Sequence, residues 1–80
     1  MNIQTLFFGM SKDLAGTSSE SIEIETGATV KTFRRFLSQK YPLFSEMDSY
    51  AIAVNESYAD EDVELSDKDT VAIIPPVSGG

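Results

Sequence analysis

The group in this chain best suited to chemistry is the terminal carboxyl of Gly80. A continuous apolar run, residues 71–74, leads through Pro75 and Pro76 to a diglycine end. Glycine has no Cβ, so the last residues could enter a channel too narrow for any side chain. The pattern is typical of a carboxyl group that is itself the reactive centre. The alternative is an inert chain end, because small residues at termini are commonly disordered.

Side chains elsewhere offer little catalytic chemistry. The sequence contains no His and no Cys, so it lacks the commonest general base, the strongest side-chain nucleophile and two of the usual metal ligands. Its acidic residues between positions 60 and 69 lack the alternate spacing, central Gly and terminal Glu of a calcium loop. We therefore expect no self-sufficient active site, no metal site, and an acidic surface exposed to solvent.

Composition sets the class of protein. The chain has 80 residues, of which 41% are hydrophobic and 24% charged, so one domain with a single core is expected. The net charge of −7 argues against nucleic acid or an anionic membrane as partner and favours a basic protein surface. No apolar run approaches the roughly 20 residues that span a bilayer, and no secretory signal pattern is present. With no cysteine, this predicts a soluble, cytoplasmic protein.

The amino-terminal part predicts a β-hairpin. Residues 2–8 form the first strand, residues 9–19 a connection, and residues 21–25 the second strand, with Ile22 and Ile24 directed inward. The first strand carries Ile3, Thr5 and Phe7 on one face and Gln4, Leu6 and Phe8 on the other.

A helix is predicted from Val30 to about Tyr41. Thr29 is placed to cap its first turn, and Pro42 disfavours helical geometry at the residue before it. The apolar stripe consists of Val30, Phe33, Leu37 and Tyr41. The basic residues expected on the solvated face are Lys31, Arg34 and Arg35.

The remaining chain predicts further strands. Residues 43–48 form an irregular connection, residues 50–55 a third strand, and a short fourth strand lies near Tyr58, followed by turns packed through Leu65. The core-facing residues of the third strand are Tyr50, Ile52 and Val54. Residues 71–74 suit a strand buried on both faces in the middle of the sheet, and the prolines end its hydrogen bonding.

This order of elements resembles the β-grasp, or ubiquitin-like, family: an α+β fold in which one main helix packs across a mixed sheet. Residues 1–74 would form the domain and residues 75–80 an extended, flexible tail. More specifically, the chain resembles the small subunit of molybdopterin synthase. The segments that carry this resemblance are Leu6-Phe7-Phe8, Leu14-Ala15-Gly16, Ala53-Val54-Asn55, Leu65-Ser66-Asp67 and the run from Val71 to Gly80.

Two positions depart from the family pattern. Lys12-Asp13-Leu14 stands where the family usually has Arg-Glu-Leu, a change that keeps the charges. Asp67-Lys68-Asp69 stands where it typically has Asp-Gly-Asp. If that turn requires a left-handed residue, Lys68 costs about 1 kcal/mol relative to glycine.

The resemblance implies a sulfur carrier that binds no cofactor itself. An E1-like adenylyltransferase would activate Gly80 with ATP, and a sulfur donor protein would convert its carboxyl to a thiocarboxylate. The tail would then enter the large catalytic subunit of a heterotetrameric molybdopterin synthase and donate sulfur to a cyclic pyranopterin precursor of molybdenum cofactor. The residues of the inserting tail would be Pro75, Pro76, Val77, Ser78 and Gly79.

Partner binding is expected on the sheet face away from the helix. The residues placed there are Leu6, Phe8, Tyr58, Ala72 and Ile74. The alternative is that a loop or the fourth strand covers them. Two other functions stay open: a related carrier for thiamine synthesis, tRNA thiolation or protein modification, and an interaction domain with an inert tail.

Overall fold

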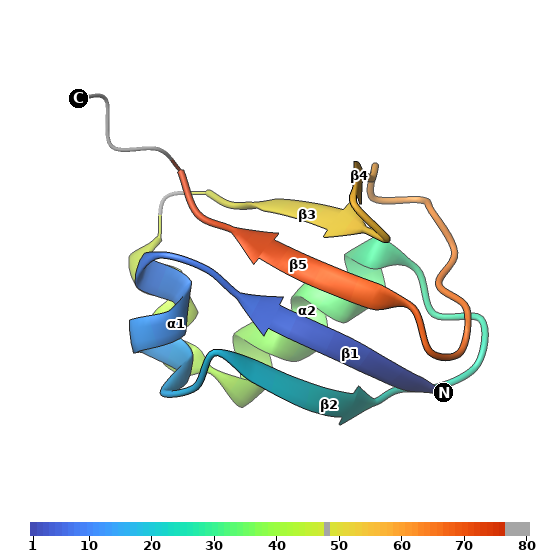
Figure 1. Ribbon diagram of the computed structural model, residues 1–80, viewed down its shortest axis with the longest axis horizontal. Helices are drawn as coiled ribbons and strands as arrows, with labels where there is room; N and C mark the ends of the chain where they lie inside the picture. Colours follow the sequence, from blue (N-terminus) through green and yellow to red (C-terminus); the bar gives the residue numbers. More distant parts are fainter. Residues whose placement is uncertain (48, 77–80) are drawn as a thin grey trace.

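The computed structural model describes residues 1–47 and 49–76, which form one mixed sheet crossed by a helix (Figure 1). The elements are β1 (Asn2–Phe7), α1 (Met10–Ala15), β2 (Ser19–Glu23), α2 (Val30–Lys40), the 3₁₀ helix η1 (Pro42–Glu46), β3 (Ala51–Val54), β4 (Ser57–Tyr58) and β5 (Thr70–Ile74). The 5-stranded sheet has the order β2-β1-β5-β3-β4. The predicted β-grasp fold is confirmed.

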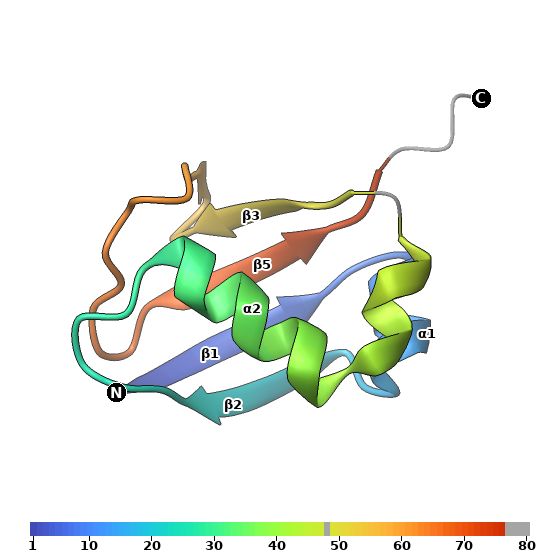
Figure 2. The same cartoon turned by 180° about the vertical axis from the view of Figure 1, so that it is seen from behind.

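The first and last strands lie side by side and parallel, with β5 in the middle of the sheet, as predicted. The expectation that β5 is buried on both faces is wrong. Val71 and Ile73 are fully buried, whereas Ala72 and Ile74 are only partly buried. The reason is that α2 covers one face alone, as the two opposite views show (Figures 1 and 2). The other face is called the outer face below.

Helix α2 forms because its apolar stripe meets the sheet. Val30, Phe33 and Leu37 each have 0% exposure. The Thr29 hydroxyl accepts a hydrogen bond from the Thr32 N–H at 3.3 Å, which confirms the predicted cap. The remaining core residues around this stripe include Ile3, Phe7, Ile22, Ile24, Ile52, Leu65, Val71 and Ile73.

The sequence interpretation missed two short helices. Helix α1 occupies the predicted connection; it begins after Gly9 and ends at Gly16, whose φ of 79° is left-handed. Ser11 is fully buried there, and its hydroxyl donates to the Phe8 carbonyl at 2.6 Å. η1 begins at Pro42 and buries Phe44. Each is too short to show an apolar period, so only their boundary residues signalled them.

The observed strand limits differ by a few residues from the predicted ones, but the side chains point in the predicted directions. β2 begins and ends earlier than predicted, yet Ile22 and Ile24 are buried. On β3, Ile52 is buried, and Tyr50 and Val54 pack partly buried against the core as expected. No helix in the described part of the chain is long and apolar enough to cross a membrane.

Candidate functional site

The candidate site begins where β5 leaves the sheet. The Phe8 N–H donates to the Ile73 carbonyl at 3.3 Å, which is the last bond between the two central strands. Pro75 and Pro76 follow and have no N–H to donate. The chain therefore leaves the sheet here, at the end that carries α1 and away from the N-terminus (Figure 1).

Gly9 lets the first proline pack closely against the domain. A Cβ built on Gly9 would lie 3.4 Å from Cγ of Pro75. The φ of Gly9 is 53° and its ψ is −135°, a conformation that residues with side chains rarely adopt. Open hollows flank the proline pair, one formed with Gly9 and Met10 and the other with residues that include Tyr58 and Ile74. Pro75 and Pro76, called the tail root below, thus lie between α1 and the outer face.

The predicted partner-binding residues share the outer face. Leu6 pairs with Ala72, Ala72 with Ala53, and Ala53 with Tyr58, so the four form one row across the sheet. Two of these residues are not covered by a loop or by the fourth strand in the described part of the chain: Phe8 is 50% and Tyr58 75% exposed. Leu6, Ala72 and Ile74 are partly exposed.

Sequence reasoning missed three residues of this region. Ala53 completes the row and is only 5% exposed between its neighbours, while Gly9 and the 41%-exposed Met10 lie beside the tail root. Strand alternation at residues 50–55 contained the signal for Ala53. Gly9 and Met10 could not be placed without α1. The remaining tail residues Val77, Ser78, Gly79 and Gly80 lie outside the described part of the chain, and their roles stay predictions.

The basic face of α2 is only partly solvated, which corrects the prediction for Arg34. Its Nε lies 2.9 Å from Oε1 of Glu61, and its Nη1 donates to the Tyr50 carbonyl at 2.9 Å. The guanidinium also lies 4.6 Å from the centre of the Tyr50 ring. Burial raises the pKa of the Tyr50 phenol above its ordinary value, and the Arg34 charge opposes that shift. Arg34 thereby fixes Tyr50, which lines one hollow beside the prolines.

The acidic side chains of the described residues include no group of three or more that could hold a metal ion. Most of the acidic segment between Asp60 and Glu64 is exposed, as predicted, with Glu61 paired to Arg34. The described part of the site therefore offers an apolar surface beside the proline pair that begins the tail.

The mixed sheet, the single main helix and the proline-led exit of its central strand define a ubiquitin-like β-grasp protein. The ThiS family model matches residues 5–80. The chain belongs to the ThiS family.

Individual relatives and solved structures show which members of the family this chain resembles. The molybdopterin synthase sulfur carrier subunit of Drosophila melanogaster is 40% identical over 86 residues, which covers 100% of this chain and 92% of the relative. A structure described as molybdopterin converting factor, subunit 1, from Pyrococcus furiosus has a TM-score of 0.89 at 31% identity, covering 96% of this chain and 99% of that one. A complex of subunits 1 and 2 of molybdopterin-converting factor from Helicobacter pylori matches with a TM-score of 0.71 at 28% identity, covering 100% of each chain. The predicted resemblance to the small subunit of molybdopterin synthase is confirmed.

Proposed function

We propose that this protein is the sulfur carrier subunit of a molybdopterin synthase and that the Gly80 carboxyl is its reactive group. An E1-like adenylyltransferase joins this carboxyl to AMP from ATP, releasing pyrophosphate. A donor protein then delivers sulfur at the sulfide level, which bonds to the acyl carbon as the C–O bond to AMP breaks, so that AMP leaves and a thiocarboxylate remains. Inside the large catalytic subunit, that sulfur passes to a cyclic pyranopterin precursor in molybdenum cofactor biosynthesis.

One observation carries the proposal: the central strand of the sheet runs directly into the proline-led tail. The tail is anchored through β5 to β1 and β3. Its root is further fixed by Pro75 against Gly9. The family match continues through residue 80, so the whole tail belongs to the shared pattern. A stiffened, pre-extended segment loses less entropy on entering a channel than a flexible one, which favours insertion.

The outer face supplies the docking surface for the large subunit in this proposal. Its apolar row and the exposed Phe8 and Tyr58 adjoin the tail root, so one partner could cover both. Contiguous apolar surface on a small domain commonly marks an interface. Because this chain has no His and no Cys, the partner provides the acid and base groups. We place the protein in the cytoplasm, since a chain without cysteine needs no oxidising compartment.

Intact-mass spectrometry tests the carrier chemistry. The protein is incubated with the adenylyltransferase, ATP and the sulfur donor, and its mass should rise by the difference between one sulfur and one oxygen atom. Fragmentation should place that change on Gly80. A reaction without ATP is the control and should leave the mass unchanged. A gain located elsewhere, or none, would refute the proposal, and recovery of the protein joined to lysines of other proteins would instead favour a modifier.

A further inference from the structure

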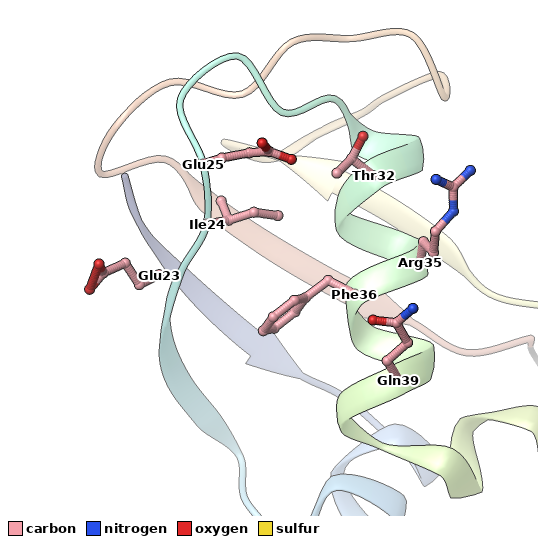
Figure 3. Close-up of a pocket in the computed structure, with 7 residues that line it drawn as sticks. All are labelled: Glu23, Ile24, Glu25, Thr32, Arg35, Phe36 and Gln39. Carbon is pink, nitrogen blue, oxygen red and sulfur yellow. The ribbon is translucent and has the colours of Figure 1, made fainter.

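The sheet has an open edge at β2 that the proposed carrier function does not use. β2 pairs with β1 on one side, and no strand among residues 1–47 and 49–76 pairs with its other side. Beside it, a groove runs between the strand and α2 (Figure 3). We call it the β2–α2 groove; its lining residues are Glu23, Ile24, Glu25, Thr32, Arg35, Phe36 and Gln39.

The register shows which backbone groups of β2 are free to bind another chain. Met1 and Ile24 exchange two backbone hydrogen bonds, of 2.7 and 2.9 Å. In an antiparallel pair such exchange recurs at every second residue. Ile22 therefore directs its backbone groups toward β1, whereas Ser21 and Glu23 direct theirs outward. The Thr17 hydroxyl accepts from the Ser19 N–H at 3.4 Å and donates to the Ser19 carbonyl at 2.9 Å. Because the backbone groups of Ser19 are already bonded, the free edge of β2 ends at Ser21.

Side-chain alternation gives a binding strand a definite pattern. Residues opposite each other in an antiparallel pair project to the same face. A residue opposite Glu23 would therefore lie on the outer face beside that carboxylate. Its two neighbours, opposite Ile22 and Ile24, would lie on the helix side. There Phe36 reaches from α2 toward Ile24 and provides an apolar floor (Figure 3).

The charge of Glu23 favours a basic residue at the central position of a binding strand. Glu23 is exposed, and no cation among the described residues forms an ion pair with it. Arg35 stands on the helix wall of the groove, so a basic side chain fits the Glu23 side better than the groove itself. A second copy of this chain would bring like charge to the edge, because the net charge is −7.

We propose that the β2 edge and the β2–α2 groove bind an extended segment of a partner protein with the pattern apolar-basic-apolar, antiparallel to β2. The basic residue lies opposite Glu23 and exchanges backbone hydrogen bonds with it, and the apolar residues cover Ile24 and Phe36. Addition of a strand to an exposed sheet edge is a recurring mode of peptide recognition. The groove lies on the helix side, whereas Pro75 and Pro76 lie beside the outer face, so both sites can be occupied together.

A fluorescein-labelled, capped peptide Ser-Val-Lys-Val-Ser is the probe, measured by fluorescence anisotropy and by amide chemical shifts of the full-length protein. We expect saturable binding, with shifts at Glu23, Ile24, Thr32 and Phe36. A peptide with Glu in place of Lys should bind about three- to tenfold more weakly. A peptide with Pro in that position should not bind, because it lacks the N–H that pairs with Glu23.

Variants of the protein test the geometry. Ser21→Pro removes an outward N–H, leaves the ladder to β1 intact and should abolish binding. Glu23→Lys should reverse the preference, so that the Glu peptide binds more tightly than the Lys peptide. Asp62→Lys makes the same charge change at an exposed site away from the groove and should change nothing. Absence of binding by the parent protein, shifts confined to the outer face, self-association through β2, or unaltered binding by Ser21→Pro would each overturn the proposal.

Discussion

Lys68 occupies a left-handed position in the turn that leads into β5. Its φ is 70°, which settles the question raised by the Asp67-Lys68-Asp69 sequence. The turn is held despite this strain because it anchors the first strand: the Lys68 N–H donates to the Asn2 carbonyl at 2.8 Å. The Asn2 N–H in turn donates to Oδ1 of Asp67 at 2.8 Å. The family's usual glycine would relieve the strain and keep both bonds.

Replacing Lys68 with glycine should therefore stabilise the protein. We expect Lys68→Gly to raise the free energy of unfolding by about 0.5–1 kcal/mol, the steric relief less the added freedom of the unfolded chain. Urea denaturation monitored by circular dichroism measures this change. Lys68→Ala is the matched control, since it removes the same charge but keeps the Cβ, and it should give no such gain. Equal stabilisation by both variants would mean that charge, rather than backbone strain, sets the effect.

Tyr41 joins the end of α2 to the edge strand. Its hydroxyl donates to Oε1 of Glu20 at 2.5 Å, and the Lys40 ammonium lies 3.5 Å from that same oxygen. Burial, and then the hydrogen bond and charge of Glu20, raise the pKa of the Tyr41 phenol well above its usual range. The fold thus favours the protonated phenol.

This raised pKa predicts a pH dependence at the alkaline end. The contribution of Tyr41 to stability is fully present below the unfolded pKa of about 10 and is lost as pH rises above it, because the unfolded chain ionises first. Tyr41→Phe should lower the free energy of unfolding by about 1–2 kcal/mol at neutral pH. The variant should also lose less stability than the parent above about pH 10. Tyr58→Phe, at an exposed tyrosine, is the control and should leave the pH dependence of the free energy of unfolding as in the parent. If Tyr41→Phe lost stability above about pH 10 as steeply as the parent does, ionisation of Tyr41 would not be the cause.

At the scale of elements, the sequence predicted what long periodic patterns specify. Alternation placed β1 and β3 and the inward direction of Ile22 and Ile52, whereas the continuous apolar run of residues 71–74 placed β5. The helical stripe with Thr29 placed α2 within one residue. It could not place α1, because that helix is held by the backbone geometry of Gly9 and by the buried Ser11 hydroxyl, which depend on tertiary packing. Nor did it predict the role of Arg34, whose partners Glu61 and Tyr50 are distant in sequence.

The outer face follows from strand alternation alone, and its proposed role can be tested there. Phe8→Asp should leave the fold intact, because half of that side chain already lies in solvent, yet abolish binding to the large subunit. Isothermal titration measures binding, and thermal unfolding verifies the fold. Leu43→Asp is the matched control: Leu43 is 54% exposed on η1, away from the outer face, and its replacement should leave affinity unchanged. If Phe8→Asp binds as the parent does, the interface lies on another face.

At the scale of the whole molecule, the fold separates surfaces that separate partners can use. The β2–α2 groove lies on the helix side, the apolar row lies on the outer face, and the central strand β5 ends at Ile74, directly before Pro75 and Pro76. In the proposed carrier, the number of residues after β5 sets how far the Gly80 carboxyl can reach from the outer face. When the outer face is docked on the partner, only one tail length places the carboxyl at the partner's catalytic centre.

Changing that length should stop sulfur transfer without affecting the fold. Removing Gly80 leaves Gly79 as a similar carboxylate, but its reacting atom falls short by about 3.3–3.6 Å, the extended rise per residue. A displacement of even about 1 Å can reduce a rate a hundredfold. The shortened protein should melt as the parent does and bind the large subunit through Phe8, yet support no measurable transfer to the pterin precursor.

Adding one alanine after Gly80 should fail too, because it moves the carboxyl and adds a Cβ where the channel admits none. Each variant is assayed for ATP-dependent mass gain and then for dithiolene formation, which separates failure of activation from failure of transfer. Parent-like transfer by either variant would mean that the position of the terminal glycine does not govern the reaction.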